Sequence, residues 1–192
     1  MKNWKIWLSI GLVVCLSILT NGCNKGAASA VNSSDGVNLP PSPTKTFSSE
    51  DIQTAMFKLG INTGNFVISD GNYVLAKREW LETEFSSGLS AFQFQFGINN
   101  WNEESNDCDK FAGAASFYLK WLNHSSRNRN VKAALAAGEV YYRRDRDGQN
   151  HAINLFILET GGQLTPSFYE PQTRRFVRLS QSEVFSVYFW KL

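Results

Sequence analysis

Cysteine is scarce in this chain, and its distribution excludes a disulfide-stabilised fold. The 192 residues include three cysteines, at positions 15, 23 and 108. Cys15 and Cys23 lie in or beside an apolar N-terminal segment, so Cys108 is the one thiol of the remaining sequence. A lone thiol in an oxidising compartment has no disulfide partner within its own chain. Cys108 is therefore either a buried structural residue or a functional one.

The sequence also lacks an excess of charge and an apolar run long enough to span a bilayer. Without residues 1–22, which hold two lysines and no acidic residue, 17 basic and 17 acidic residues remain. This balance argues against a nucleic-acid partner. The mostly apolar run Ile6–Leu19 follows Lys2 and Lys5 and is shorter than the ~20 residues of a transmembrane helix. It is typical of a secretion signal.

The residues after this run resemble a bacterial lipobox, in which a small residue precedes the cysteine that is lipidated. The segment reads Leu19-Thr20-Asn21-Gly22-Cys23, with threonine three places before the cysteine, where leucine is usual. We therefore expect residues 1–22 to be a lipoprotein signal peptide and Cys23 to be the lipidation site. Acyl groups on Cys23 would hold the protein on a membrane without a transmembrane helix. The predicted location is the cell envelope, at the outer membrane or periplasmic face in a Gram-negative cell.

Composition divides the rest of the chain into a tether and one domain. Residues 23–47 follow the signal and are rich in Gly, Ala, Ser and Pro, with few large apolar side chains. Such a segment buries too little apolar surface to offset its chain entropy, which predicts a flexible tether. Residues 48–192 have the length of a single domain and are rich in aromatic residues.

Periodicity within residues 48–192 predicts an α+β fold. Apolar spacing predicts helices near Ser49–Leu59, Leu75–Phe85 and Asp107–Asn123, while Phe92, Phe94 and Phe96 alternate as in a strand over 89–96. Alternation and turn residues after position 138 predict an antiparallel sheet, with strands over 139–144, 151–158, 164–169, 175–179 and 186–190. We expect the N-terminal helical part to pack the helix that carries Cys108 against this C-terminal sheet.

Three residues in the order Cys108, His151 and Glu170 offer a nucleophile, a base and a group that orients the base. Cys108 stands at the start of a predicted helix, where exposed N–H groups stabilise a thiolate. His151 begins one strand of a predicted hairpin and Glu170 ends the next, so both side chains belong at the same end of that hairpin. This pattern predicts a cysteine hydrolase, more specifically a protease that acts on peptide or protein substrates.

The segment from Trp101 to Gln172 resembles the papain-like cysteine protease domain of the Marasmius oreades agglutinin family. The runs Asn106-Asp107-Cys108-Asp109, His151-Ala152-Ile153-Asn154 and Glu170-Pro171-Gln172 carry the resemblance, together with Trp101. It implies a papain-like fold, with Cys108 as nucleophile, His151 as general base and Glu170 as the residue that orients it. Trp101 and Gln172 would border the substrate cleft. The sugar-binding N-terminal half of those agglutinins has no counterpart in this sequence.

The same resemblance implies activation by calcium or manganese, with Asp107 and Asp109 as candidate ligands. Both ions prefer oxygen ligands, and calcium takes about six to eight of them. Two carboxylates therefore make only part of a site. Helix capping by Asp107 and a solvated charge at Asp109 explain the two residues equally well.

Two other functions remain open from the sequence. A peptidoglycan hydrolase of the NlpC/P60 or CHAP type also places Asp-Cys at a helix start and a histidine at the start of a strand. Its usual second histidine would have to be His124, which lies near a predicted helix end. The third possibility is a non-catalytic envelope lipoprotein that acts as an inhibitor or a binding module.

Overall fold

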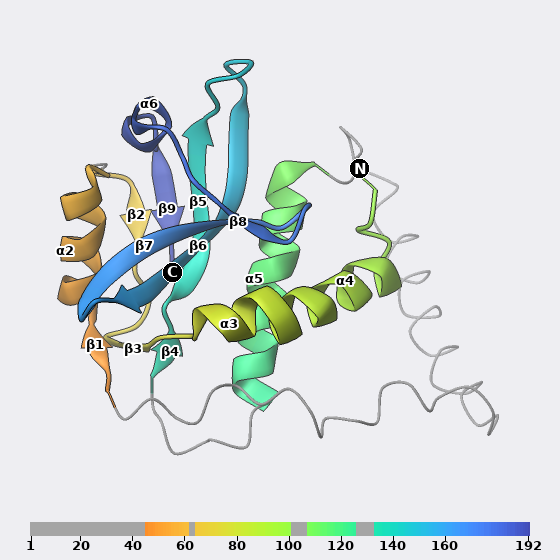
Figure 1. The fold of residues 1–192 in the computed structure, drawn as a ribbon, viewed down its shortest axis with the longest axis horizontal. Coiled ribbons are helices and arrows are strands. Elements are labelled where there is room, and N and C mark those ends of the chain that lie inside the picture. The colour runs from red at the N-terminus through yellow and green to blue at the C-terminus, as the bar shows by residue number, and fades with distance from the viewer. Residues whose placement is uncertain (1–44, 62–63, 101–106, 126–132) are drawn as a thin grey trace, which may run out of the picture. The chain divides into compact units, whose positions relative to one another are not determined.

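The described part of the chain is an α+β fold in which helices flank a curled sheet of six strands (Figure 1). The computed structural model describes residues 45–61, 64–100, 107–125 and 133–192. Within these ranges, none of the helices combines the length and the apolar character needed to cross a membrane. The predicted signal peptide, Cys23 and most of the predicted tether lie outside the described residues.

The first helix begins and ends where the sequence predicts. Helix α2 (Ser49–Leu59) has Ser48 as its N-cap, whose hydroxyl accepts a hydrogen bond from the Asp51 N–H at 3.1 Å. Gly60 ends the helix at φ 97°, a left-handed conformation that glycine adopts without strain. Strand β1 (Phe47–Ser48) comes immediately before the helix, and its Phe47 is buried. The fold thus includes the last residue of the range predicted as tether.

The strand predicted over residues 89–96 is wrong, because this segment is helical. Three elements form one continuous helical stretch: α3 (Arg78–Trp80), a π-helical turn η1 (Leu81–Phe85) and α4 (Ser86–Gln95). Leu89 and Gln93, four residues apart, form the buried side of α4, whereas Phe94 and Phe96 are exposed. The alternating phenylalanines therefore did not mark a buried face. The helix predicted to begin at Leu75 begins instead at Arg78.

The main sheet is almost entirely antiparallel and has the strand order β2-β9-β5-β6-β7-β8. Among the described strand pairs of this sheet, the β2–β9 pair alone is parallel. The strands are β2 (Phe66–Val67), β5 (Ala137–Arg143), β6 (Asn150–Thr160), β7 (Gln163–Glu170), β8 (Arg175–Val177) and β9 (Phe189–Lys191). These positions confirm the predicted C-terminal antiparallel sheet. A short helix, α6 (Gln181–Phe185), precedes β9 and was not predicted.

A second, smaller sheet joins early and middle parts of the chain. It has the order β1-β3-β4, with β3 (Asn72–Val74) and β4 (Ala134–Leu135) in parallel. Tyr73 in β3 is fully buried and pairs with Phe47 in β1. The sheet therefore fixes the start of the fold beside the strand that leads into β5.

Strand β6 is buried on both faces because a separate apolar core covers each of them. Ile153, Leu155 and Ile157 belong to one core, which includes Ile52 and Met56 of α2. The alternate residues Phe156 and Leu158 belong to the other core, which includes side chains of α4 and of α5 (Cys108–Ser125). Since side chains alternate across a strand, successive residues of β6 pack into one core and then the other, and β6 lies between the helices. The predicted packing of the cysteine helix on the sheet is thus present.

Candidate functional site

The structure brings His151 and Glu170 into direct contact. His151 is the second residue of β6 and Glu170 is the last residue of β7. His151 Nε2 lies 2.8 Å from Glu170 Oε2, and the two side chains are only 6% and 15% exposed. The β6–β7 hairpin turns at Gly161 and Gly162, both of which have positive φ. This short hairpin returns the chain so that the start of β6 and the end of β7 meet.

Cys108 completes the arrangement from the first turn of α5. Its sulfur is hydrogen-bonded to the His151 ring, which lowers the pKa of the thiol; the Ala152 N–H, which donates to the same sulfur, lowers it further. Burial and the nearby Asp107 carboxylate oppose these effects without reversing them. Because Glu170 takes Nε2, Nδ1 is the ring nitrogen left for the thiol. The positive end of α5 favours the thiolate as well.

The pKa of His151 is shifted in the opposite direction, upward. Burial alone would favour the neutral ring, but the hydrogen bonds to Cys108 and Glu170 outweigh it and raise the pKa of His151 to about 9. The Tyr142 ring meets the imidazole edge to face, with ring centres 5.7 Å apart. The lowered pKa of Cys108 and the raised pKa of His151 both shift the pair toward a thiolate beside an imidazolium. Such a pair is nucleophilic toward electrophiles, and the imidazolium is an acid.

The loop after β7 is tied to both Glu170 and α4. Glu170 Oε1 accepts a hydrogen bond from the Gln172 N–H at 3.2 Å, so Gln172 lies next to Glu170. Its role at the border of a substrate cleft stays a prediction. Gln93 donates from Nε2 to the Pro171 carbonyl at 3.1 Å and is buried. Gln93 therefore supports the loop that carries Glu170. Trp101, the other residue predicted to border the cleft, lies outside the described residues.

Asn154 joins the cysteine helix to the sheet. Its Nδ2 lies 2.9 Å from the Ala112 carbonyl, 3.0 Å from Ser116 Oγ and 3.1 Å from the Gly138 carbonyl. Ala112 and Ser116 belong to α5, whereas Gly138 belongs to β5. Because Asn154 is buried, these contacts fix α5 in position along β6. Cys108 and His151 owe their proximity partly to this amide.

The residues predicted to bind a metal lie beside Cys108 but do not make a complete site. A hydrogen bond between the two carboxyl groups lowers the pKa of Asp107 and raises that of Asp109, and burial and the charge of Asp107 raise the pKa of Asp109 further. Lys110 Nζ also lies 3.3 Å from Asp107 Oδ1. Among the described residues, no group of three or more His, Cys, Asp or Glu side chains is placed to hold a metal ion. Two carboxylates supply too few oxygens for calcium.

Two residues of the site, Tyr142 and Ala152, were not predicted from the sequence. Tyr142 pairs directly with His151 across the β5–β6 hairpin, and the hairpin register could have identified it. The Ala152 N–H contributes through its backbone, which leaves no mark in side-chain chemistry. His124, the alternative second histidine, is exposed at the end of α5. It lies more than four helical turns along α5 from Cys108, so it is remote from this site.

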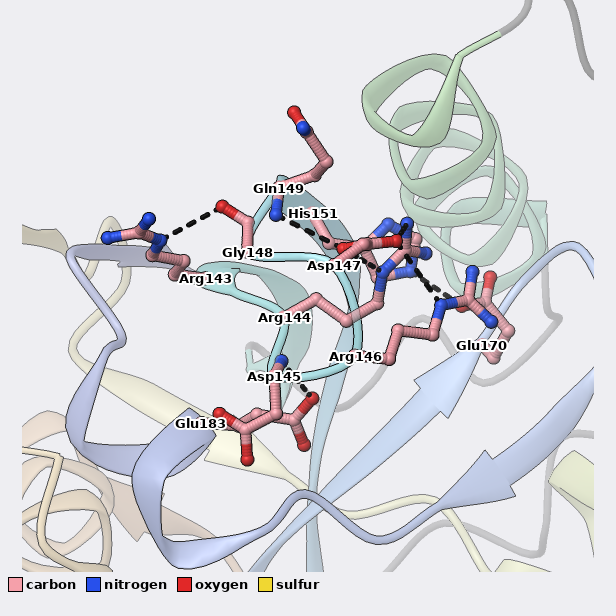
Figure 2. A network of polar contacts seen from close by, with 10 residues as sticks. All are labelled: Arg143, Arg144, Asp145, Arg146, Asp147, Gly148, Gln149, His151, Glu170 and Glu183. Atoms are coloured by element: carbon pink, nitrogen blue, oxygen red, sulfur yellow. Dashed lines mark hydrogen bonds and ion pairs between the residues drawn. The ribbon is translucent and has the colours of Figure 1, made fainter.

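The β5–β6 hairpin tip next to the site is rich in charge (Figure 2). Arg144 makes two hydrogen bonds to Asp147, from Nε at 3.1 Å and from Nη2 at 2.6 Å. These bonds lower the pKa of Asp147 to about 2. The Asp145 N–H donates to Glu183 of α6 at 3.0 Å. The charged side chains of the tip are therefore paired with one another, which is consistent with a solvated hairpin end.

The fold is shared with solved structures of a fungal lectin. One is described as PSL1a in complex with E64, with a TM-score of 0.59 and 19% identity over 77% of this chain and 51% of that one. Another is Polyporus squamosus lectin bound to the human-type influenza-binding epitope Neu5Acα2-6Galβ1-4GlcNAc, with a TM-score of 0.60 and 22% identity over 77% and 49%. The chain spans about half the length of these structures. No protein-family model and no curated protein matches this sequence.

These comparisons confirm the resemblance to the agglutinin group at the level of the fold. They contradict the prediction of a cysteine protease, and with it the prediction that the chain is an enzyme, because this fold is that of a lectin. The prediction inferred a reaction, peptide hydrolysis, from the presence of an activated thiol alone. A polarised thiol in a cleft does not by itself define what is bound or whether a bond is broken.

Proposed function

We propose that this chain is a non-catalytic, carbohydrate-binding protein held at the cell envelope. The observation that carries the proposal is a cluster of aromatic rings on α5, on α4 and at the C-cap of α4, in which three of the five rings are exposed. The Polyporus squamosus lectin, of which this chain matches about half the length, is bound to a sugar epitope, which makes carbohydrates the first class of ligand to test. This proposal develops the binding-module alternative that the sequence left open.

The cluster, which we call the aromatic face, consists of Phe92, Phe96, Phe117, Tyr118 and Trp121. Phe92 lies at its centre, with ring centres 4.6 Å from Phe96, 5.0 Å from Tyr118 and 6.1 Å from Phe117. Trp121 lies 6.0 Å from Tyr118. Phe96 and Phe117 are each 61% exposed and Trp121 is 48% exposed. An exposed apolar cluster of this kind is typical of a binding surface.

Aromatic rings suit sugars because the C–H groups on one side of a pyranose form a flat apolar patch. Removing that patch and a ring from water together is favourable, and the electron-rich ring face attracts the polarised C–H hydrogens. The hydroxyl groups at the sugar's rim remain in water or meet polar side chains. A platform of several rings therefore binds a short oligosaccharide rather than a single sugar.

The Cys108 site is proposed as a second, separate region of polar contacts, because Phe117 lies nine residues from Cys108 and on the opposite side of α5. The Cys108 sulfur and the Glu170 carboxylate accept hydrogen bonds from hydroxyl groups, and the protonated His151 ring donates them. Trp101 and Gln172 are proposed to border this cleft. The papain-like packing of the cysteine helix belongs to the proposal as an arrangement of elements, without peptidase activity.

Membrane attachment and metal binding are further parts of the proposal. Lipidation at Cys23, after removal of residues 1–22, would place the domain of residues 48–192 on the envelope through the tether 23–47. Calcium or manganese would need oxygen ligands in addition to Asp107 and Asp109. Saturable calcium binding that Asp109→Asn weakens would support these two residues as ligands.

A direct test is the binding of the full chain, held in lipid nanodiscs, to immobilised Neu5Acα2-6Galβ1-4GlcNAc and to Galβ1-4GlcNAc. Trp121→Ala and Phe117→Ala are each expected to weaken binding about tenfold, since one stacked ring contributes roughly 1.4 kcal/mol. Phe94→Ala is the matched control. Phe94 lies on the same helix as Phe92 and is 74% exposed, but the described structure gives it no ring contact with the aromatic face.

Two results would overturn the proposal. One is the absence of binding across a broad glycan array, or binding that the Trp121 and Phe94 variants weaken equally. The other is release of peptides from a denatured protein substrate that Cys108→Ala abolishes. That second result would show that the chain is an enzyme.

A further inference from the structure

We propose that a groove beneath the edge of the main sheet binds a fatty acid through its apolar chain and its carboxylate. The groove lies away from the Cys108 site, between the C-terminal end of α2, the strands β7 and β8, and α6. Its volume is about 560 Å³, within the range of small-molecule sites. Its apolar lining includes Leu59, Pro166, Phe168, Phe176, Leu179 and Val184.

The charged residues in the lining are all cationic. Arg78 and Arg178 contribute to the groove, and no Asp or Glu is among the described residues that line it. Arg78 is already engaged, because its Nε lies 3.0 Å from Glu82 Oε1 and its guanidinium lies 4.2 Å from the centre of the Phe176 ring. Arg178 makes neither a hydrogen bond nor an ion pair with any other described residue. Arg178 is exposed and lines the groove, so its guanidinium is available to a bound ligand.

The acidic residues Asp145 and Glu183 line a neighbouring hollow with Arg178, but neither forms an ion pair with it. Glu183 is occupied by the Asp145 N–H and the Ser180 N–H, at 3.0 Å and 2.9 Å. The Asp145 carboxylate accepts hydrogen bonds from the Ser180 and Ser182 hydroxyls, at 2.5 Å and 2.6 Å. Both carboxylates are satisfied within the α6 region. A ligand carboxylate would be the complementary partner for Arg178, since guanidinium binds it with two parallel hydrogen bonds.

The apolar lining selects against a small hydrophilic anion. Phe168, Leu179 and Val184 are themselves largely buried, so the groove floor belongs to the packed core on the α2 side of the sheet. Such a floor stabilises a hydrocarbon chain, and each added methylene that leaves water tightens binding about fourfold. The combination of an apolar floor with one free guanidinium therefore fits a molecule that carries a carboxylate at the end of an aliphatic chain.

The test uses the full chain in lipid nanodiscs, with empty nanodiscs as the blank, and calorimetric titration with octanoate, decanoate and decanol. Decanoate is expected to bind saturably and more tightly than octanoate, and decanol is expected to bind at least tenfold more weakly than decanoate. Arg178→Gln should remove this preference for the carboxylate. Arg175→Gln is the matched control, because it removes the same charge three residues earlier and outside the groove lining.

Equal affinities for decanoate and decanol, or an unchanged preference in Arg178→Gln, would overturn the inference. Tighter binding of an acetylated peptide ending in leucine than of decanoate would also overturn it, in favour of a peptide terminus. Uptake by empty nanodiscs equal to that of loaded ones would show partitioning only and would exclude a protein site. These outcomes do not depend on the aromatic face, so the proposed function is tested separately.

Discussion

His151 Nε2 and Glu170 Oε2 lie 2.8 Å apart although 19 residues separate them in the sequence. Their contact closes one end of the β6–β7 hairpin and fixes the imidazole ring so that its other nitrogen faces Cys108. The pair is shielded from solvent, which strengthens the interaction relative to a surface ion pair. The protonation of the side chains in this site therefore depends on two adjacent strands as well as on the helix that carries Cys108.

The imidazole of His151 should titrate near pH 9, well above the ~6.5 of a free histidine. Because the pKa is raised on folding, the stability that this interaction contributes is complete below about pH 6.5 and is lost as the pH rises through about 9. Nuclear magnetic resonance of the ring protons would measure it, with the exposed His124 as the second resonance. Glu170→Gln should lower the midpoint. A midpoint near 6.5 in the unaltered protein would contradict the described geometry.

Cys108 should react with iodoacetamide at a pH at which an ordinary thiol is inert. The hydrogen bond from His151 lowers the pKa of the thiol, so the rate of alkylation should reach half its maximum below the ~8.5 of a free cysteine. Mass spectrometry of the Cys108 peptide separates this reaction from any at Cys15 or Cys23. His151→Ala should move the profile back toward 8.5, whereas His124→Ala should leave it in place. A profile unaffected by His151→Ala would refute the pairing.

Loss of the Asn154 amide should loosen the cysteine helix. Asn154→Leu leaves the buried carbonyls of Ala112 and Gly138 without this donor, and we expect the free energy of unfolding to fall by about 3 kcal/mol. Ser116→Ala removes only a hydroxyl partner and should cost about 1 kcal/mol. Chemical denaturation measures both values. Cys108 alkylation should also slow in Asn154→Leu, a result that a purely local packing defect would not produce.

Cys23 should carry the lipid. Cys23→Ser is expected to abolish incorporation of labelled palmitate and to move the chain from the membrane fraction to the soluble or uncleaved one. Cys15→Ser, which lies inside the apolar run of the expected signal peptide, should be lipidated normally. Equal labelling of the two variants would place the lipid elsewhere or exclude a lipoprotein.

Local signals in the sequence predicted the elements that depend on neighbouring residues. The Ser48 cap and the Gly60 stop define α2 through contacts within a few residues, and turn residues with alternating apolar positions define the strands after β5. The strand predicted over 89–96 failed because Phe94 and Phe96 are exposed while Leu89 and Gln93 are buried. Periodicity records only residue type, and the side that is buried depends on what packs against the helix.

The sequence by itself determined the α+β class, the lone thiol, and the residue types that meet in the site. The hairpin register even implied that His151 and Glu170 share an end of the sheet, because strand lengths on either side of Gly161 and Gly162 are similar. Only the tertiary structure decided that Asn154 anchors α5, that rings of α4 and α5 form one exposed face, and that Arg178 opens onto an apolar groove. These features join segments far apart in the chain, and long-range packing leaves no local pattern from which to read it.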